Sequence, residues 1–249
     1  MKKKSVVVTG GNSGIGLNIT EAFINAGYYV VVGARRDLNL TEKYGNKVSF
    51  IPTDVRDQYA HIDLVNEAIS KTGQLDVYIN NAGFSEWRPI RDIDNNFLDE
   101  IISTNLKGAF WGCKAASSVM KEGASIINIS SIAGKRGSTN NSAYCATKFG
   151  MNGLTQSLAK ELGPSGIRVN AVCPVIVQTD GLIEALKSPS SPAYPNPKEF
   201  ISNFKKSNAA LGRLPSGEEI ASMCLMLSSE SASAVTGQCI NVDCGVFPQ

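Results

Sequence analysis

Histidine is almost missing from this chain of 249 residues, because His61 is the only one. A Ser-His-Asp hydrolase needs a histidine beside its nucleophile, and a zinc site usually recruits histidine or paired cysteines. The six cysteines are dispersed and contain no C-x-x-C pair. We therefore expect neither kind of site, no bound metal, and thiols that are free and mostly buried. His61 lies in a polar stretch, and we expect it on a helix surface.

Net charge and long apolar runs are also scarce. The formal net charge is +2 and no long basic run occurs, which disfavours nucleic acid as the main partner. Lys2-Lys3-Lys4 precedes only a short apolar stretch, too short for a signal-peptide core, and nothing later approaches transmembrane length. We expect a cytoplasmic protein that does not bind a membrane.

Short apolar segments rich in Val and Ile alternate with helical patterns along the whole chain. This alternation predicts a doubly wound, Rossmann-type α/β fold, with a parallel sheet and helices on both faces, in a single domain over 1–249. The expected strands are 5–9, 28–34, 48–52, 75–80, 125–130, 167–172 and 238–242. The expected helices lie around 15–26, 64–69, 97–120, 143–162 and 218–227.

One segment interrupts the alternation. Residues 187–197 hold four prolines in eleven positions, which prevents a regular helix or a central strand. The flanks, 180–186 and 198–206, have the pattern of short helices. Such an excursion is either a functional lid or a disordered surface loop. Because it follows a predicted strand end, we expect 180–206 to be a substrate lid.

A glycine-rich turn follows the first predicted strand. Gly10, Gly14 and Gly16 have the spacing T-G-x-x-x-G-x-G. In such a turn, backbone N–H groups meet phosphate groups at the positive end of a helix, and glycine lets the backbone approach closely. The turn therefore predicts a bound dinucleotide.

The end of the second predicted strand discriminates between the two common dinucleotides. An NAD site usually places a carboxylate there for the ribose 2′-OH, and Ala34 offers none. Arg35 and Arg36 follow, and a charge-assisted bond to a 2′-phosphate contributes about 1.5–3 kcal/mol. We predict NADP. The alternative is that both arginines only solvate the strand end and Asp37 binds the 2′-OH of NAD. Asp54, after the third strand, either accepts a bond from adenine or caps the next helix.

Tyr144 and Lys148 are four residues apart, so on a helix they share a face, and Ser131 lies thirteen residues before Tyr144. Lowering a tyrosine pKa from about 10 to about 7 requires about 4 kcal/mol. One ammonium at about 4 Å supplies this in an effective dielectric of about 20. The plain alternative is a surface lysine beside a half-buried tyrosine. With the glycine turn, the pair predicts hydride transfer with a nicotinamide.

These motifs resemble the compact, single-domain branch of the short-chain dehydrogenase/reductase family, which includes the 3-oxoacyl-ACP reductases. Asn80-Asn81-Ala82-Gly83, Asn105 in N-L-K-G, and Pro174 with Thr179 extend the resemblance over essentially the whole chain. It implies a seven-stranded parallel sheet and a homotetramer or homodimer. The chain departs from the family pattern at Val175, where glycine is usual, and at Cys244-Gly245, where Gly-Gly is usual.

The resemblance also implies roles for individual residues. Tyr144 would be the general acid in reduction or the base in oxidation, and Lys148 would lower its pKa and bind the nicotinamide ribose. Ser131 would bond the substrate oxygen, and Asn105 would hold a water in a proton relay. Motifs and resemblance together predict these cofactor-binding residues: Gly10, Asn12, Ser13, Gly14, Ile15, Gly16, Arg35, Arg36, Asp54, Val55, Asn81, Ala82, Gly83, Tyr144, Lys148, Pro174, Val177 and Thr179.

The substrate is the least determined part of the prediction. Ser85, Trp87 and Asn141 are candidate pocket residues that would suit a sugar-like, polyol or ketoacyl carbonyl, although Trp87 could equally pack the lid or a subunit interface. The lid favours a small polar carbonyl or alcohol, and NADP favours reduction. Two alternatives stay open: an NAD-dependent alcohol or sugar dehydrogenase, and a nucleotide-sensing protein without turnover.

Overall fold

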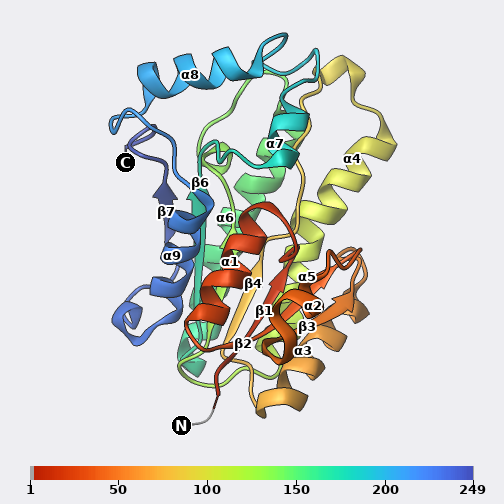
Figure 1. Ribbon diagram of the computed structural model, residues 1–249, viewed down its shortest axis with the longest axis vertical. Coiled ribbons are helices and arrows are strands. Elements are labelled where there is room, and N and C mark those ends of the chain that lie inside the picture. Colours follow the sequence, from red (N-terminus) through yellow and green to blue (C-terminus); the bar gives the residue numbers. More distant parts are fainter. Residues whose placement is uncertain (1–2, 249) are drawn as a thin grey trace.

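The computed structural model describes residues 3–248. Within them, seven strands form one parallel sheet in the order β3-β2-β1-β4-β5-β6-β7 (Figure 1). The strands are β1 Ser5–Thr9, β2 Tyr29–Ala34, β3 Val48–Pro52, β4 Val77–Asn80, β5 Ser125–Ile129, β6 Arg168–Pro174 and β7 Cys239–Val242. The predicted seven-stranded, Rossmann-type sheet is confirmed, and every predicted strand end lies within two residues of the observed one.

Helices cover both faces of the sheet. The longer helices are α1 Gly14–Asn25, α3 Gln58–Thr72, α5 Gly108–Ser117, α6 Ser142–Leu162, α8 Pro197–Asn208 and α9 Gly217–Ser228. The shorter ones are α2 Leu40–Tyr44, α4 Asn95–Ile102 and α7 Asp180–Ala185. None of the helices among residues 3–248 has both the length and the apolar character that crossing a bilayer requires.

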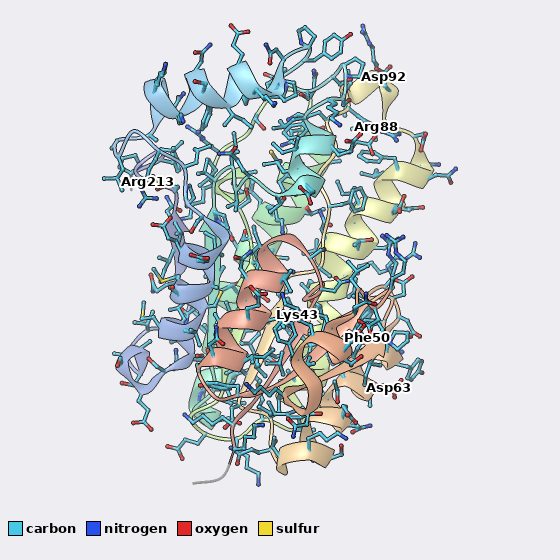
Figure 2. The ribbon with its side chains drawn as sticks, in the orientation of Figure 1. Lys43, Phe50, Asp63, Arg88, Asp92 and Arg213 are labelled. Atoms are coloured by element: carbon cyan, nitrogen blue, oxygen red, sulfur yellow. The ribbon has the colours of Figure 1, made fainter. Side chains whose placement is uncertain are left out.

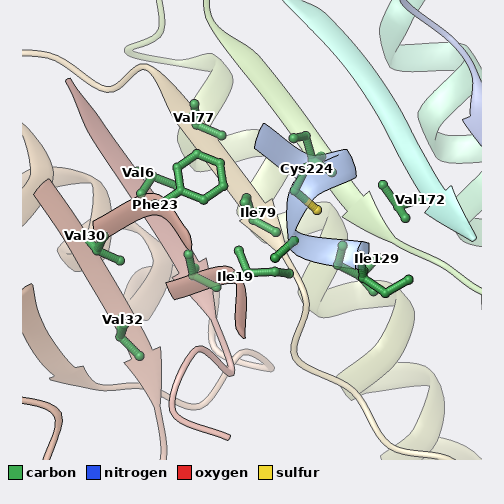
Figure 3. Close-up of a cluster of buried hydrophobic side chains, with 14 of the residues drawn as sticks. Val6, Ile19, Phe23, Val30, Val32, Val77, Ile79, Ile129, Val172 and Cys224 are labelled. Atoms are coloured by element: carbon green, nitrogen blue, oxygen red, sulfur yellow. The ribbon is translucent and has the colours of Figure 1, made fainter. Parts of the chain in front are cut away.

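Alternate residues of each strand enter two different cores, as the period of two in a strand requires. Val6 and Val8 of β1 pack with Phe23 of α1 and Cys224 of α9, in the cluster shown in Figure 3. Val7, between them, faces the cluster formed by α3, α5 and α6. Burial on both faces explains why the strands read as continuous apolar runs instead of alternating ones.

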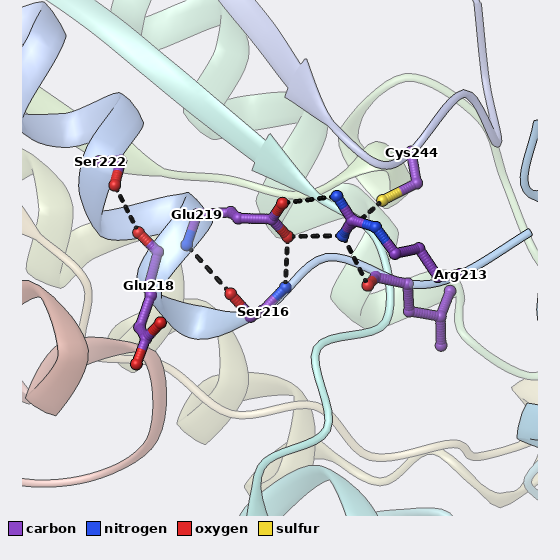
Figure 4. Close-up of polar contacts among 7 residues, drawn as sticks. Arg213, Ser216, Glu218, Glu219, Ser222 and Cys244 are labelled. Atoms are coloured by element: carbon purple, nitrogen blue, oxygen red, sulfur yellow. Dashed lines mark hydrogen bonds and ion pairs between the residues drawn. The ribbon is translucent and has the colours of Figure 1, made fainter. Parts of the chain in front are cut away.

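The end of the long connection before α9 is fixed by a capping box. Ser216 accepts a bond from the N–H of Glu219 at 3.2 Å, and the Glu219 carboxylate accepts one from the N–H of Ser216 at 2.9 Å (Figure 4). Arg213 donates to the same carboxylate at 2.7 and 2.8 Å. These charge-assisted bonds hold the pKa of Glu219 down to about 2 and set where α9 begins.

The predicted helix over 97–120 is interrupted. α4 passes into a π-helical turn, Ser103–Lys107, which passes into α5. π turns insert an extra residue into a helix and are frequent at functional sites. The interruption rotates Asn105 inward, where its side chain is fully buried.

The sheet reverses its direction of growth at β1, which pairs with β2 on one side and with β4 on the other. In open parallel sheets, ligands bind beyond the carboxyl ends of the strands at this reversal. The glycine turn follows β1 and Asn81 follows β4, so both motifs lie at the reversal.

Candidate active site

The turn after β1 has a shape that favours glycine. Gly10 and Gly14 have φ values of +63° and +52°, and a Cβ on Gly16 would lie 2.0 Å from the Gly10 carbonyl oxygen. Ser13 and Ile15 complete the entry into α1, whose first turn carries no acidic residue in the described chain. The positive end of the helix thus faces a cradle almost free of side chains, which fits a phosphate group.

The segment after β4 is fastened to this turn. Nδ2 of Asn81 donates to the carbonyl oxygens of Thr9 and Gly10 at 2.9 and 3.1 Å, and the N–H of Ala82 donates to Oγ1 of Thr9 at 3.1 Å. Gly83 passes so close to Asn105 that a Cβ there would lie 3.0 Å from Oδ1. Residues 81–83 therefore connect the glycine turn to the π turn.

The end of β2 presents two exposed arginines. Ala34 is buried against the sheet, and Arg35 and Arg36 are exposed and form no salt bridge with any residue of the described chain. Nδ2 of Asn12 donates to the carbonyl oxygen of Arg36 at 2.8 Å, which holds the glycine turn beside them. Two unpaired guanidinium groups at this position suit a further phosphate group.

Asp37 is engaged elsewhere. Its Oδ1 accepts a bond from the N–H of Leu40 at 3.0 Å and its Oδ2 accepts one from the Thr41 hydroxyl at 3.2 Å. The carboxylate thereby stabilises the start of α2. A ribose hydroxyl would have to compete with these two bonds.

The residues after β3 differ from one expectation. The Asp54 carboxylate forms a salt bridge with Arg56, with Nε at 2.9 Å from both oxygens, and this bond lowers the pKa of Asp54. The residue that caps α3 is Asp57, which accepts from the N–H of Tyr59 at 2.9 Å. The alternative that Asp54 caps this helix is therefore wrong. Its carboxylate stays at the surface, beside Val55.

The expectation that His61 lies on a helix surface is also wrong. The side chain is fully buried, with Nε2 at 2.9 Å from the Val55 carbonyl oxygen and Nδ1 at 2.7 Å from the Tyr78 hydroxyl. A carbonyl oxygen only accepts, so Nε2 carries the proton and Nδ1 accepts from Tyr78. Burial lowers the pKa of His61 and keeps it neutral. The residue holds the segment after β3 onto the sheet.

Asn105 is locked between two elements. Its Oδ1 accepts from the N–H of Phe84 at 3.0 Å, and Nδ2 donates to the Phe84 carbonyl oxygen at 2.8 Å and to Oγ1 of Thr147 at 3.4 Å. The π turn thus fixes the segment after β4 against α6.

Ser131, Tyr144 and Lys148 come together where β5 ends. Oγ of Ser131 accepts from the N–H of Ala133 at 3.1 Å, and its hydroxyl is close enough to Tyr144 to act on the pKa of the phenol. Nζ of Lys148 donates to the Ile129 carbonyl oxygen at 2.7 Å and lies 5.6 Å from the centroid of the Tyr144 ring. Lys148 is only 4% exposed, so the alternative of a surface lysine is wrong.

The electrostatics of this group differ from the expectation. Burial raises the pKa of Tyr144 to about 12, although the bond from Ser131 opposes the change. Burial also lowers the pKa of Lys148 to about 8. The expected lowering of the tyrosine pKa toward neutrality is therefore wrong for the protein alone. Loss of solvent disfavours both charged forms, and the ammonium faces a carbonyl oxygen and the ring.

The chain after β6 returns to the glycine turn. Ser131 Oγ lies 3.4 Å from the Pro174 carbonyl oxygen, Val177 is buried, and Thr179 caps α7 by accepting from the N–H of Leu182 at 3.3 Å. A Cβ on Gly14 would lie 3.3 Å from Cγ2 of Thr179. This segment links the serine at one side of the site to the phosphate cradle at the other.

Val175, which replaces the usual glycine, is part of a small apolar cluster. It packs against Ile132, Ala209 and Val246, as does Phe204 of α8. Cys244 also contacts this cluster and has a φ of +56°, a left-handed conformation that favours glycine. Both departures from the family pattern thus lie beneath α8.

The candidate substrate residues have mixed surroundings. Ser85 is half-buried, and Trp87 packs on the apolar core of the 180–206 segment. Asn141 is buried, and its Nδ2 donates to Oγ of Ser138 at 3.2 Å. Oδ1 of Asn141 has no partner among the described residues, which leaves one acceptor free just before α6.

Residues 3–248 contain no group of three or more histidine, cysteine or acidic side chains placed to hold a metal ion. The buried polar groups at the site are amide, hydroxyl and ammonium groups.

Proteins of known family resemble this chain over nearly its whole length. Residues 10–247 match the family model described as Enoyl-(Acyl carrier protein) reductase. The chain is 37% identical to L-2,3-butanediol dehydrogenase of Corynebacterium glutamicum, with 98% of each protein covered. It is 34% identical to 3-oxoacyl-[acyl-carrier-protein] reductase FabG of Chlamydia muridarum, covering 98% of this chain and 97% of that protein.

Solved structures agree at the level of the fold. A short-chain dehydrogenase/reductase of Brucella melitensis, titled a glucose/ribitol dehydrogenase, superposes with a TM-score of 0.88 at 31% identity, covering 99% of this chain and 97% of that one. The aldohexose dehydrogenase of Thermoplasma acidophilum gives 0.87 at 30% identity, covering 98% and 94%. The chain belongs to the short-chain dehydrogenase/reductase family, whose members are NAD(P)-dependent oxidoreductases acting on alcohols and carbonyls.

Proposed function

We propose that this chain is an NADP-dependent oxidoreductase that reduces a small polar carbonyl compound, with Tyr144 as the general acid. The observation that carries the proposal is the convergence of Ser131, Tyr144 and Lys148 at the end of β5. Close contacts connect this group to the glycine turn through Pro174 and Thr179. The reacting carbonyl and the cofactor can therefore meet in one crevice.

The protonation states support reduction. With a pKa raised to about 12, Tyr144 carries its proton at neutral pH, which is the form that a general acid needs. The reduced nicotinamide, when bound, supplies the hydride. Tyr144 then gives its proton to the carbonyl oxygen, which Ser131 orients with its hydroxyl group. The ammonium of Lys148 stabilises the negative charge that develops on the Tyr144 oxygen.

Three features support NADP over NAD. Ala34 provides no carboxylate at the end of β2, Arg35 and Arg36 are exposed and unpaired within residues 3–248, and the Asp37 carboxylate is occupied by α2. A 2′-phosphate would find two guanidinium groups, whereas a 2′-hydroxyl would find no free carboxylate on this segment.

A second candidate is an NAD-dependent alcohol or sugar dehydrogenase on the same scaffold. The names of the relatives favour it, because they include a butanediol dehydrogenase and a probable galactose dehydrogenase of Rhizobium meliloti. A nucleotide-sensing protein without turnover would have no need for Asn105, Ser131, Tyr144 and Lys148 together.

The wider organisation is part of the same proposal. We assign residues 1–249 to one domain, of which 1–2 and 249 lie outside the described residues, and 180–206 to a substrate lid. We place Ser85, Trp87 and Asn141 on the side of this lid that would face the substrate. We also propose that the protein is a homotetramer or homodimer in the cytoplasm.

The test is the consumption of NADPH and NADH by the purified protein with ketoacyl thioesters, keto sugars, diketones and quinones, using Tyr144→Phe as the blank. Tyr144-dependent oxidation of NADPH by one class supports the proposal and identifies the substrate. Faster turnover with NADH supports the second candidate. Tight NADPH binding without turnover of any class would contradict the reductase assignment.

A further inference from the structure

Asn140 joins three segments of the chain, one of which leads into the helix that carries Tyr144. Its carbonyl oxygen accepts a bond from the N–H of Arg88 at 2.7 Å, and its Nδ2 donates to the carbonyl oxygen of Ser190 at 3.1 Å. Arg88 belongs to the segment after β4, Ser190 lies between α7 and α8, and Asn140 itself lies two residues before α6. One residue thus bridges the substrate side, the lid and the helix that carries the tyrosine.

The backbone of Asn140 does not by itself call for an amide side chain. Its φ is +56°, in the left-handed region that disfavours residues with a Cβ and that glycine adopts freely. Asparagine is the residue with a side chain that tolerates this region best, and here its amide is a donor to Ser190. The hydrogen bond to Ser190 is therefore the contact that glycine could not make at this position.

The lid is held together by its own contacts, so that one hydrogen bond to it can restrain the whole segment. Oγ of Ser191 donates to the Leu186 carbonyl oxygen at 2.7 Å and accepts from the N–H of Ala193 at 3.0 Å. Trp87 packs against the apolar core of the lid. That core consists of Leu186, Ala193 and Ile201, which are 1%, 2% and 6% exposed. A bond to Ser190 therefore restrains the whole lid.

The other end of the bridge is anchored too. The Arg88 guanidinium lies 4.0 Å from the centroid of the Phe97 ring on α4 and forms salt bridges with Glu86 at 2.6 Å and Asp94 at 3.7 Å. Arg88 lies at the same end of the molecule as α8 (Figure 2). Asn140 therefore connects two structured parts of the chain next to the helix that carries Tyr144.

We propose that Asn140 is a positioning residue that latches the lid over the site and limits the size of the carbonyl compound that enters. The proposal rests on the proposed function, in which Tyr144 protonates the substrate and 180–206 covers it. Asn140 acts through the lid and does not contact the reacting atoms.

The variant that tests it is Asn140→Gly, which keeps the left-handed backbone and the bond from Arg88 but removes the amide. Loss of one neutral hydrogen bond corresponds to about threefold to tenfold in an equilibrium constant. We expect KM for the best small carbonyl substrate to rise by about that factor. We expect kcat to stay within about twofold, and a bulkier carbonyl of the same class to gain in relative kcat/KM.

Asn39→Gly is the matched control. Asn39 also has a left-handed backbone, with φ of +62°, and its side chain makes no capping bond at α2 in the described chain. The Asn39→Gly variant should leave KM, kcat and the preference for substrate size unchanged. Asn140→Asp keeps the size of the side chain but removes the donor, so it should behave like Asn140→Gly.

Hydrogen exchange measured by mass spectrometry separates this proposal from the proposed function. In Asn140→Gly without substrate, the amides of 186–194 should exchange faster, while those of α6 should not change. Unchanged exchange in 186–194, or an unchanged KM and size preference in an active enzyme, overturns the latch. Faster exchange in a protein that turns over no carbonyl supports the latch and contradicts only the proposed function.

Discussion

Tyr144 and Lys148 titrate far from their ordinary values and in opposite directions, which gives the two directions of the reaction different pH dependences. Tyr144, with its pKa raised to about 12, stays protonated through the neutral range. Lys148, with its pKa lowered to about 8, loses its charge as the pH rises through that value. In the proposed mechanism, reduction would use the protonated tyrosine and the ammonium, whereas oxidation would need the deprotonated tyrosine.

We therefore expect kcat for reduction to be level below about pH 8 and to fall above it, and kcat for oxidation to rise with pH between about 7 and 10. Steady-state rates in both directions across this range test the prediction. A reduction rate that increases through pH 8 would contradict it.

Tyr144→Phe removes only the proton donor. We expect turnover to fall by about 10²- to 10⁴-fold, the usual contribution of a general acid, while NADPH affinity changes by less than about twofold. Rate measurements and fluorescence titration of NADPH test both parts. Tyr59→Phe, at a tyrosine that is 66% exposed on α3, is the control. Turnover close to that of the unmodified protein would remove Tyr144 from the mechanism.

His61→Phe tests a structural residue. The change leaves the Tyr78 hydroxyl and the Val55 carbonyl oxygen buried without this partner, at about 1–3 kcal/mol each. We expect the free energy of unfolding to fall by about 2–5 kcal/mol in urea titrations. Adding Tyr78→Phe should recover part of the loss, because it removes one of the two unpaired groups. A change below about 0.5 kcal/mol would mean that neither bond matters.

At the scale of elements, the strands were predictable because both faces of the sheet are buried. Each strand is then a short run of apolar residues with turn residues on either side, and no tertiary information is needed to find it. The segment 180–206 was predictable as an irregular excursion because its four prolines within 187–197 disfavour regular structure. Its flanking helices, α7 and α8, begin within one residue of the expected positions.

The features that escaped prediction depend on contacts between distant segments. The π turn at 103–107 has no sequence pattern of its own, and the inward position of Asn105 results from it. His61 has polar neighbours on α3, but its partners lie on β4 and in the loop after β3. Asn140 was not singled out beside its neighbour Asn141, because its side-chain bond is to Ser190, fifty residues away.

The end of β2 is the element that we expect to select the cofactor. Arg35→Ala combined with Arg36→Ala removes both guanidinium groups, and one charge-assisted bond corresponds to about tenfold to hundredfold in affinity. We expect Kd for NADPH to rise by at least about tenfold and Kd for NADH by less than about threefold. Arg91→Ala, at an arginine whose side chain is 84% exposed beyond β4, is the control. An equal loss for both cofactors would show that a 2′-phosphate is not bound there.

At the scale of the whole molecule, cofactor preference should be visible in stability without any turnover. A ligand at a hundred times its Kd stabilises the folded state by about 2.7 kcal/mol, which for a chain of this length corresponds to about 5–10 °C in Tm. We expect NADPH to raise Tm by this amount and NADH to raise it less at the same concentration. Differential scanning fluorimetry measures both. An equal or larger shift with NADH would favour the second candidate function.

The two halves of the proposed site come from different parts of the chain. The glycine turn and the two neighbouring arginines, Arg35 and Arg36, lie within the first 36 residues. Ser131, Tyr144, Lys148 and the proposed lid all follow residue 130. Contacts at Thr179 and at 81–83 join them. Changes in the lid should therefore alter substrate preference without altering cofactor preference.

The burial of His61 also shapes the titration curve of the protein. Surface carboxylates titrate near pH 4 and surface amines above about pH 10, and an exposed imidazole is the usual side chain that buffers between them. Here the single imidazole is enclosed, and burial lowers its pKa. The chain therefore buffers less between about pH 5.5 and pH 7 than it would with an exposed imidazole. Its charge of +2, and with it its retention on an ion exchanger, should change less across that interval than the charge of a chain with a histidine on its surface.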